Sequence, residues 1–361
     1  MPQGEGRALV IDNYGDKPPL AAVRALARGG FSPVVAASGS HSLAAASRYC
    51  KTVIAAPPVT AAGFRKAIDH MSRARQFVAV LPASDDAIEA LGLPEAQLLD
   101  KGRLAKRAME SGLMLPPSVI FSSGEALLDG SSELDFPVVV KPLRGKPATF
   151  AAKQGDLMRW RVVSTPLMVQ PFLTHGMWSI SGVVWRGRLM AAVHQRYLRI
   201  WPPNCGGASA AETIDPDEET ERRVLSLVAE HNGIFQAQFS GQYLLDLNPR
   251  VYGSMSLAVE AGANLPAIYC ALLQGREIAP CRGRSGVFYR WLDGDVRSIG
   301  RGLWRRELTA GRGAAALLPR RHAAHGIESI RDPQPLIAQL SARLTRMSRR
   351  LRGPNSTPQL S

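Results

Sequence analysis

The segment YLLDLNPRVYGS, residues 243–254, decides how the rest of this 361-residue chain is interpreted. Its apolar start predicts a β-strand, which an Asn-Pro pair ends. Because residues two apart on a strand face the same side, we expect Asp246 and Asn248 to share one face while Leu245 and Leu247 face the core. Two oxygen-bearing side chains on one face suit Mg²⁺, which takes few protein ligands and completes its shell with water and phosphate.

Basic residues accompany this segment in a regular order. Arg250 follows on the same side of the predicted strand, where a guanidinium can stabilise a phosphoryl group or a carboxylate. Lys141 ends an apolar strand and is expected to point into a cleft, and Lys101 opens a helix. Two converging ammonium groups can neutralise the α- and β-phosphates of a nucleotide. The residues alone therefore indicate a site for a metal and phosphates.

Taken in order, these motifs resemble the ATP-grasp superfamily. The resemblance covers about residues 8–275 and is most specific over 98–264, and the run that ends at Pro266 looks like the predicted carboligases (carboxylate–amine ligases) of that superfamily. The segments that carry it are Asp100-Lys101, 137–142, 169–173 with Gly176, and 246–254. The resemblance implies that ATP lies between two α+β lobes, and that a carboxylate is phosphorylated and then attacked by an amine.

The resemblance also implies roles for individual residues. The residues expected to bind ATP are Lys101, Lys141, Gln170, Pro171, Phe172 and Leu173, the last four as a hinge beside the adenine. The expected Mg²⁺ ligands are Asp246, Asn248 and, where the family commonly has a second acidic ligand, Gln238. The expected catalytic cation is Arg250, joined near the γ-phosphate by Arg199 or its neighbour Arg196.

The predicted fold class is α/β followed by α+β. Four short apolar strands with helices between them predict a parallel sheet; they span residues 8–11, 31–37, 52–55 and 77–81. The dinucleotide fingerprint GxGxxG is missing after the first strand, so no NAD domain is expected. We expect a Rossmann-like domain over residues 1–93, a two-lobed ATP-grasp domain over 94–275, and a basic, mainly helical C-terminal extension over 276–361 with a disordered tail.

Composition narrows the class of protein further. The chain is 45% apolar with a formal net charge of +14, and its four cysteines form no CxxC pair. Scattered cysteines, the lack of a secretory signal and the lack of a long apolar run predict a cytoplasmic protein without a membrane span. From Arg282 to Arg352 there are sixteen arginines and five acidic residues, so the basic charge is concentrated in the last quarter.

Three hypotheses follow. The first is an ATP- and Mg²⁺-dependent ligase that joins a small-molecule carboxylate to an amine. The second is a degenerate ATP-grasp protein that binds nucleotide or a metabolite without turnover, because Gln238 is neutral and the loop at 143–147 has a single glycine. The third is a protein that binds an anionic polymer through its arginine-rich end, although few aromatic residues interleave with those arginines, which argues against nucleic acid. The sequence does not decide the oligomeric state, and a homodimer is one possibility because relatives are often dimers.

Overall fold

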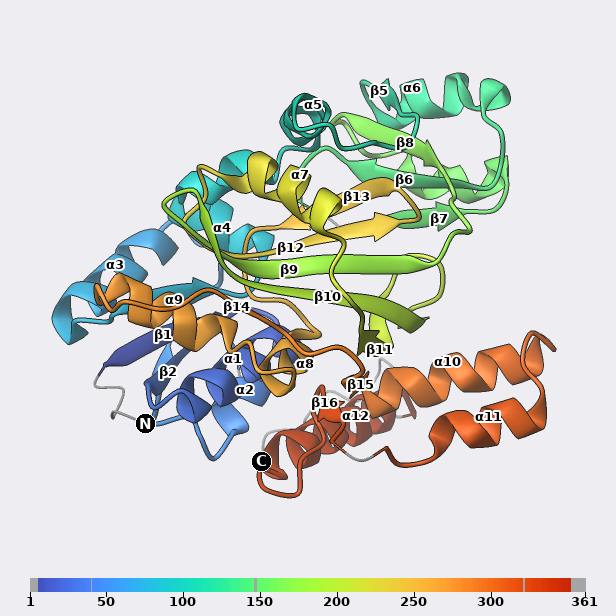
Figure 1. The fold of residues 1–361 in the computed structure, drawn as a ribbon. Coiled ribbons are helices and arrows are strands. Elements are labelled where there is room, and N and C mark those ends of the chain that lie inside the picture. The colour runs from blue at the N-terminus through green and yellow to red at the C-terminus, as the bar shows by residue number, and fades with distance from the viewer. Residues whose placement is uncertain (1–5, 40, 146–147, 321, 352–361) are drawn as a thin grey trace, which may run out of the picture.

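The residues that the structure describes form three β-sheets with helices around them (Figure 1). The structure is a computed structural model that describes residues 6–39, 41–145, 148–320 and 322–351, the last six by their backbone alone. A parallel sheet formed by the N-terminal part lies at one end, a large sheet lies in the middle, and a small sheet lies at the opposite end. Most of the residues predicted to form the site lie on strands of the central and small sheets or directly after them, and Lys101 is the first residue of α5 (Lys101–Glu110).

The N-terminal sheet is parallel throughout, with the order β3-β2-β1-β4, as predicted. Its strands are β1 (Arg7–Asp12), β2 (Ser32–Ala37), β3 (Thr52–Ala55) and β4 (Ala79–Pro82). Its helices are α1 (Lys17–Arg28), α2 (Leu43–Ala46), α3 (Phe64–Arg75) and α4 (Asp85–Leu91). Side chains along β1 point alternately to the two faces of the sheet. Ala8 and Val10 pack in the core on one face, and Leu9 and Ile11 pack in the core on the other.

The small sheet is antiparallel, with the order β5-β8-β6-β7. Its strands are β5 (Val119–Phe121), β6 (Val138–Pro142), β7 (Thr149–Ala151) and β8 (Leu167–Pro171). Helix α6 (Gly124–Asp129) packs on it, and α5 (Lys101–Glu110) precedes it in the chain. The predicted apolar strand ending in Lys141 is therefore β6, in the middle of this sheet.

The central sheet has eight strands, seven of them in the order β13-β12-β9-β10-β11-β15-β16, with β14 paired to β10. Its long strands are β9 (Met177–Trp185), β10 (Arg188–Trp201), β11 (Gly207–Thr213), β12 (Gly233–Ser240) and β13 (Tyr243–Asn248). The short ones are β14 (Cys281–Arg282), β15 (Phe288–Arg290) and β16 (Ala324–His325). The predicted hairpin across Gly187 is the antiparallel pair β9–β10.

Two apolar cores cover the faces of the central sheet. On one face Val183 and Val193 share a core with α1, α8 (Met255–Glu260) and α9 (Leu265–Leu273). On the other face Ile180 and Phe235 pack with α5 and α7 (Glu218–Val228). Because the first core includes residues of β1 and β2, the N-terminal sheet and the central sheet are parts of one packed body.

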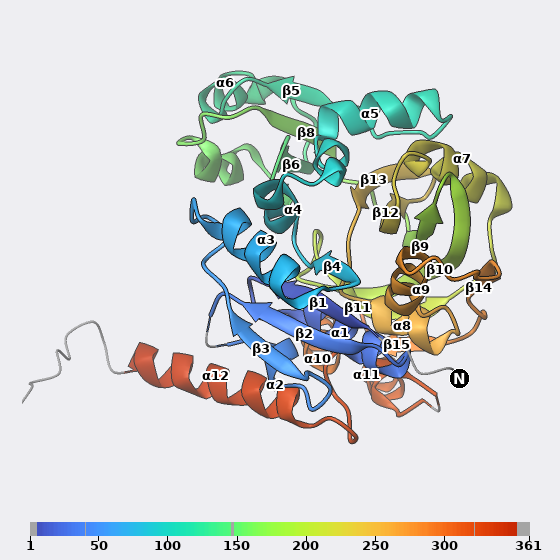
Figure 2. The same cartoon turned by 90° about the vertical axis from the view of Figure 1, so that its left-hand side faces the viewer.

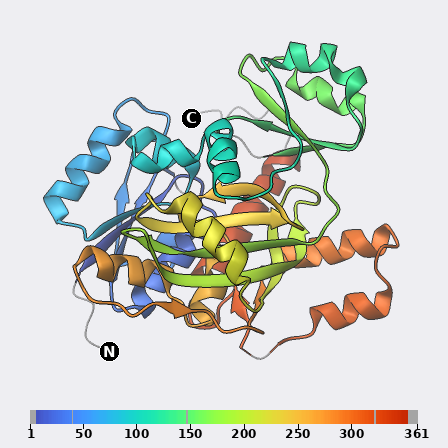
Figure 3. The ribbon, with the colours of Figure 1, turned by 45° about the horizontal axis from the view of Figure 1, so that its top comes forward.

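The C-terminal part is helical, as predicted, but it also completes the central sheet with β14, β15 and β16. Its helices are α10 (Leu292–Trp304), α11 (Ala310–Leu317) and α12 (Gln334–Leu351). The hairpin of α10 and α11 projects from the body (Figures 1 and 3), whereas α12 runs beneath α2 and β3 (Figure 2). The predicted disordered tail lies outside the described residues. Within the part of the chain that the structure describes, no helix combines the length and apolarity needed to cross a membrane.

A buried carboxylate attaches the C-terminal part to the N-terminal sheet. Asp332 has no exposed surface, and its oxygens accept hydrogen bonds from the Arg24 side chain (2.9 Å), the Ser47 hydroxyl (2.7 Å) and the Arg48 backbone amide (2.9 Å). Charged groups are rarely buried without partners, because desolvation then costs several kcal/mol per ion. This carboxylate therefore fixes the start of α12 against α1 and α2.

We expect Asp332→Ala to lower the free energy of unfolding by about 3 kcal/mol or more, since it leaves a half-buried guanidinium and two further donors without their acceptor. Urea denaturation monitored by circular dichroism measures the change. Glu219→Ala is the matched control: it removes an exposed ion pair with Arg223 on α7 and should cost less than about 1 kcal/mol. Equal effects of the two substitutions would contradict the anchoring role of Asp332.

Candidate active site

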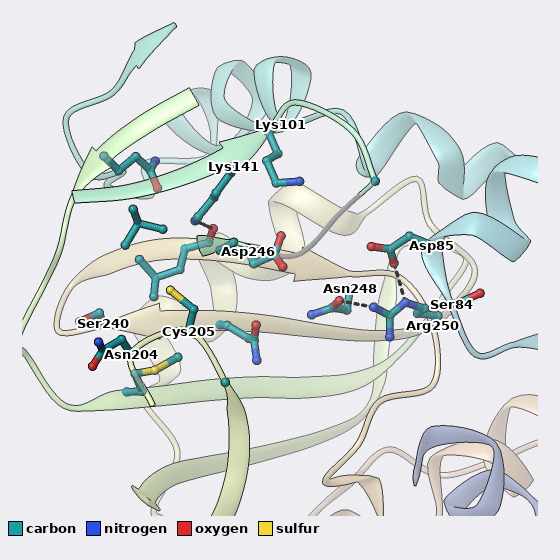
Figure 4. Close-up of a pocket in the computed structure, with 18 of the residues that line it drawn as sticks. Ser84, Asp85, Lys101, Lys141, Asn204, Cys205, Ser240, Asp246, Asn248 and Arg250 are labelled. Atoms are coloured by element: carbon teal, nitrogen blue, oxygen red, sulfur yellow. Dashed lines mark hydrogen bonds and ion pairs between the residues drawn. The ribbon is translucent and has the colours of Figure 1, made fainter. Parts of the chain in front are cut away.

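A cavity of about 650 Å³ lies between the small sheet and the β12–β13 edge of the central sheet (Figure 4). Residues of β6, β8, β12, β13, the N-terminal end of α5 and the loop after β4 all line it. It brings together ten of the residues that the sequence singled out: Lys101, Lys141, Gln170, Pro171, Phe172, Leu173, Gln238, Asp246, Asn248 and Arg250. These residues come from five separate segments of the chain, so their convergence is a result of the fold.

Two ammonium groups face the cavity from the small-sheet side. Lys141 is buried, and its Nζ donates a hydrogen bond to the carbonyl oxygen of Leu245 (3.0 Å). Burial lowers the pKa of Lys141, and the nearby charge of Lys101 lowers it further, while Asp246 opposes both. In Figure 4 both lysine side chains extend from the small-sheet side toward the strand that carries Asp246. An anionic ligand between the two ammonium groups would relieve their desolvation and mutual repulsion.

A β-bulge corrects one expectation about the strand β13. Gln238 pairs with Asp246, but the next pair is Phe239 with Leu244, so Leu245 is an extra residue on β13. As a result Leu244 packs in the core with Leu247, whereas Leu245 lines the cavity. The prediction that Leu245 faces the core was wrong because strict alternation does not hold across a bulge.

The three predicted metal ligands lie on neighbouring strands in register. Gln238 is directly opposite Asp246, and its amide nitrogen donates to the Tyr197 hydroxyl (2.9 Å), which leaves the amide oxygen for another partner. The Asn248 amide oxygen already accepts a hydrogen bond from Arg250 (2.8 Å). Among the described residues no group of three or more His, Cys, Asp or Glu side chains is placed to hold a metal. One carboxylate with two amides suits a Mg²⁺ whose other ligands are phosphates and water.

Arg250 links the central sheet to the N-terminal sheet. Its guanidinium contacts Asp85 (2.5 Å) as well as Asn248, and it is largely buried. Asp85 is the first residue of α4, and Ser84 is the N-cap, whose hydroxyl accepts a hydrogen bond from the Ala87 amide. Asp85 follows β4, at the carboxyl end of a parallel strand, which is where ligands bind in open α/β sheets. It lies in the first turn of α4 and lines the cavity as well.

Arg199 is not among the described residues that line this cavity. Its guanidinium binds Asp295 of α10 at 2.5 and 3.1 Å, and that carboxylate has no exposed surface. Arg196, the alternative, pairs with Glu212 on β11. Both arginines are engaged with neighbouring elements, and the structure offers no support for a phosphate contact by either of them.

The hinge residues close the small-sheet end of the cavity. Gln170 is buried, and its amide nitrogen donates to the Ser118 hydroxyl (2.9 Å). The Phe172 ring stands edge-on to Phe150 at 4.8 Å between centroids. This arrangement gives one end of the cavity an aromatic and amide lining, which suits a flat heterocycle. In the loop after β6, Arg144 is bound to Asp100, the N-cap of α5, while Lys146 and Pro147 lie outside the described residues.

Several cavity residues were not predicted. The turn after β1 contributes Tyr14, whose hydroxyl binds Asp86, and Asp16; the loop between β10 and β11 contributes Asn204 and Cys205. The position of the first turn at the carboxyl end of a parallel strand was a usable signal, because ligands bind there in open α/β sheets. The second loop carries no motif that marks it.

Comparison with known proteins places this geometry in context. The family model for "ATP-grasp in the biosynthetic pathway with Ter operon" matches residues 163–294. No curated protein matches the sequence.

Solved structures share the fold at low sequence identity. The N5-carboxyaminoimidazole synthetase of Staphylococcus aureus is 13% identical with a TM-score of 0.59, over 77% of this chain and 79% of that one. The L-amino acid ligase of Bacillus licheniformis is 15% identical with a TM-score of 0.56, over 75% and 74%. The phosphoribosylglycinamide synthetase of Anaerococcus prevotii is 11% identical with a TM-score of 0.51, over 75% and 76%. Together with the family model that matches residues 163–294, this shared fold confirms the resemblance to the ATP-grasp superfamily.

We expect a double-mutant cycle on Asp85→Ala and Arg250→Ala to give a coupling energy of about 1 kcal/mol, because the pair is partly buried and joins two sheets. The free energies of unfolding of the wild type, both single variants and the double variant measure it. Additive effects would show that the two side chains do not stabilise each other. Arg65→Ala with Asp69→Ala is the control cycle, since that pair is exposed and 3.8 Å apart.

Proposed function

Because this chain has the ATP-grasp fold, we propose that it is an ATP- and Mg²⁺-dependent ligase that couples a small-molecule carboxylate to an amine. One observation carries the proposal: Lys101 and Lys141 face Asp246, Asn248 and Arg250 across a single cavity between two sheets. Cations on one wall and metal-binding oxygens on the other are what a magnesium–triphosphate complex requires.

In this proposal the residues of the chain position the reactants and neutralise their negative charge. Lys101 and Lys141 hold the phosphate oxygens, and Asp246 with the amide oxygens of Asn248 and Gln238 holds the metal. ATP, when bound, supplies the phosphoryl group that converts the substrate carboxylate into an acyl phosphate, from which the amine displaces phosphate. Arg250 stabilises the charge that develops at the reacting centre. Such a transfer depends on positioning and electrostatics, and no nucleophilic side chain is needed.

The names of the similar structures support this class of reaction. They include an L-amino acid ligase and a phosphoribosylglycinamide synthetase. At these identities the similarity concerns the fold, so the carboxylate and the amine are left to experiment.

We expect MgADP at about a hundred times its Kd to stabilise the wild type by about 2.7 kcal/mol, because binding to the native state raises stability by mass action. Asp246→Ala should abolish most of this stabilisation, and Mg²⁺ alone should have little effect because the site holds one carboxylate. Thermal unfolding with and without nucleotide measures both. Asp69→Ala, on the exposed face of α3, is the control and should respond like the wild type. Absence of any wild-type response would refute the nucleotide site.

We expect phosphate release from ATP to require both an acid and an amine, and Arg250→Ala to reduce this rate by about a hundredfold or more, as removal of a group that stabilises developing charge does. A screen of acid and amine pairs with a coupled phosphate assay measures the rate, with Arg188→Ala, at the exposed start of β10, as the control. Nucleotide binding without turnover for any pair would favour the degenerate ATP-grasp protein.

One observation about the metal ligands supports this second function, a degenerate ATP-grasp protein that binds nucleotide without turnover. The Asn248 amide oxygen already accepts a hydrogen bond from Arg250, and Gln238 offers only a neutral amide oxygen, so Asp246 is the one charged ligand among these three residues. The third hypothesis loses support from the pairing of C-terminal arginines within the protein. Arg282 binds Glu221, Arg290 binds Asp295, and Arg343 binds Asp293.

A further inference from the structure

A second chamber of about 210 Å³ adjoins the main cavity. The two share the walls formed by Asp246, Asn248, Arg250 and Gln238, so the chamber opens at the reacting end of the proposed nucleotide site. Its remaining wall residues include Lys17, Tyr197, Gln236, Tyr252, Gly253 and Ser254. The chamber is far larger than the space one water needs. It therefore has room for a small organic molecule beside the phosphate site.

Lys17 is an unusual wall residue because its charge is buried and unpaired. It is the first residue of α1, and only 8% of it is exposed. Its Nζ lies 3.5 Å from the centroid of the Trp291 ring. This ammonium group makes no hydrogen bond or ion pair with any residue that the structure describes. An ammonium at this depth normally has a carboxylate or several acceptors.

The acidic residues near Lys17 already have other partners. The Asp16 carboxylate accepts a hydrogen bond from the backbone amide of Lys17 itself. Asp293 forms ion pairs with the guanidinium groups of Arg297 and Arg343. Glu328 accepts backbone amides at the start of α10 and after β16. These carboxylates raise the pKa of Lys17, but burial outweighs them and lowers it to about 8. Around neutral pH the side chain is charged, and it is short of an anionic partner.

We propose that this chamber binds the carboxylate substrate and that Lys17 holds a second anionic group of that substrate. The inference rests on the proposed ligase function and narrows its substrate to small acids that carry two anionic groups, the second a carboxylate or a phosphoryl group. The reactive carboxylate lies toward Asp246 and Arg250, and the second group lies against Lys17 and Ser254. Pairing with an anion offsets the desolvation of the buried ammonium, which gives the site its preference for a dianion over a monoanion.

Glycine at position 253 keeps the space beside the ammonium open. A Cβ there would lie 3.6 Å from Cε and 3.8 Å from Nζ of Lys17, in ordinary contact and without strain on the protein. Gly253→Ala thus places a methyl group where an anion would approach, while the charge of Lys17 stays in place. This substitution tests the site without removing a buried charge.

The test measures binding of three probes of similar length by calorimetry, in the presence of saturating MgADP: succinate, 3-phosphonopropionate and butyrate. We expect wild type to bind at least one of the two dianions about tenfold or more tightly than butyrate, as one added charge-assisted hydrogen bond implies. Preference for succinate indicates a carboxylate as the second group, and preference for the phosphonate indicates a phosphoryl group. Equal binding of all three, or none, overturns the proposal.

The variants separate this proposal from the ligase function. Lys17→Gln, Lys17→Met and Gly253→Ala should each remove the preference for the dianion and retain the thermal response to MgADP, because Lys17 and Gly253 do not line the nucleotide cavity. Lys66→Gln, on the exposed side of α3, is the control and should keep both. A dianion preference that survives in the Lys17 variants overturns the role of Lys17. Loss of the MgADP response in wild type instead refutes the nucleotide site.

If the Lys17 variants do not fold, wild type still provides a test. The preference for the dianion should fall as pH rises through about 8, where Lys17 loses its proton. A preference that is unchanged between pH 7 and pH 10 would contradict the role of this ammonium.

Discussion

The hydrogen bond from the Lys141 ammonium to the carbonyl oxygen of Leu245 joins the small sheet to the central sheet at the bottom of the cavity. Its acceptor, Leu245, is the extra residue of the bulge in β13 and lies at the cavity wall. With the two sheets held in this way, Lys101 and Lys141 lie across from Asp246, and the cavity of about 650 Å³ falls within the usual range for small-molecule sites. Bulges often redirect groups next to active sites in this manner.

The site depends on all three parts of the chain. The central sheet and the residues after β13 supply the oxygens and Arg250, the small sheet with α5 supplies the two lysines and the hinge, and α4 of the N-terminal part supplies Asp85 against Arg250. The C-terminal part contributes Trp291, which contacts Lys17, and Asp295, which engages Arg199. A shared apolar core between the N-terminal and central sheets keeps these parts in register. Through these two contacts the C-terminal part supports residues on the N-terminal and central sheets.

The walls of the cavity carry charges of both signs, and the carboxylates among them are Asp16, Asp85, Asp86 and Asp246. Lys17, Lys101, Lys141 and Arg250 border the two connected chambers. Burial of Lys141 and Lys17 lowers the pKa of each, which is the electrostatic consequence of ammonium groups held apart from solvent without enough counter-charge. A ligand rich in phosphate and carboxylate supplies that counter-charge.

Local patterns in the sequence determined the elements of this protein. Alternating apolar runs specified the parallel strands, and an apolar run ending in Lys141 specified β6, because periodicity and turn residues act over a few positions. The order of Lys101, Lys141, the hinge and the segment at 246–250 was enough to indicate the ATP-grasp fold. Only the tertiary structure decided that Leu245 lines the cavity, that Arg199 forms an ion pair with Asp295, and that Lys17 is buried against Trp291. Each of these depends on contacts between segments far apart in the chain, where register, burial and competing partners outweigh any local preference.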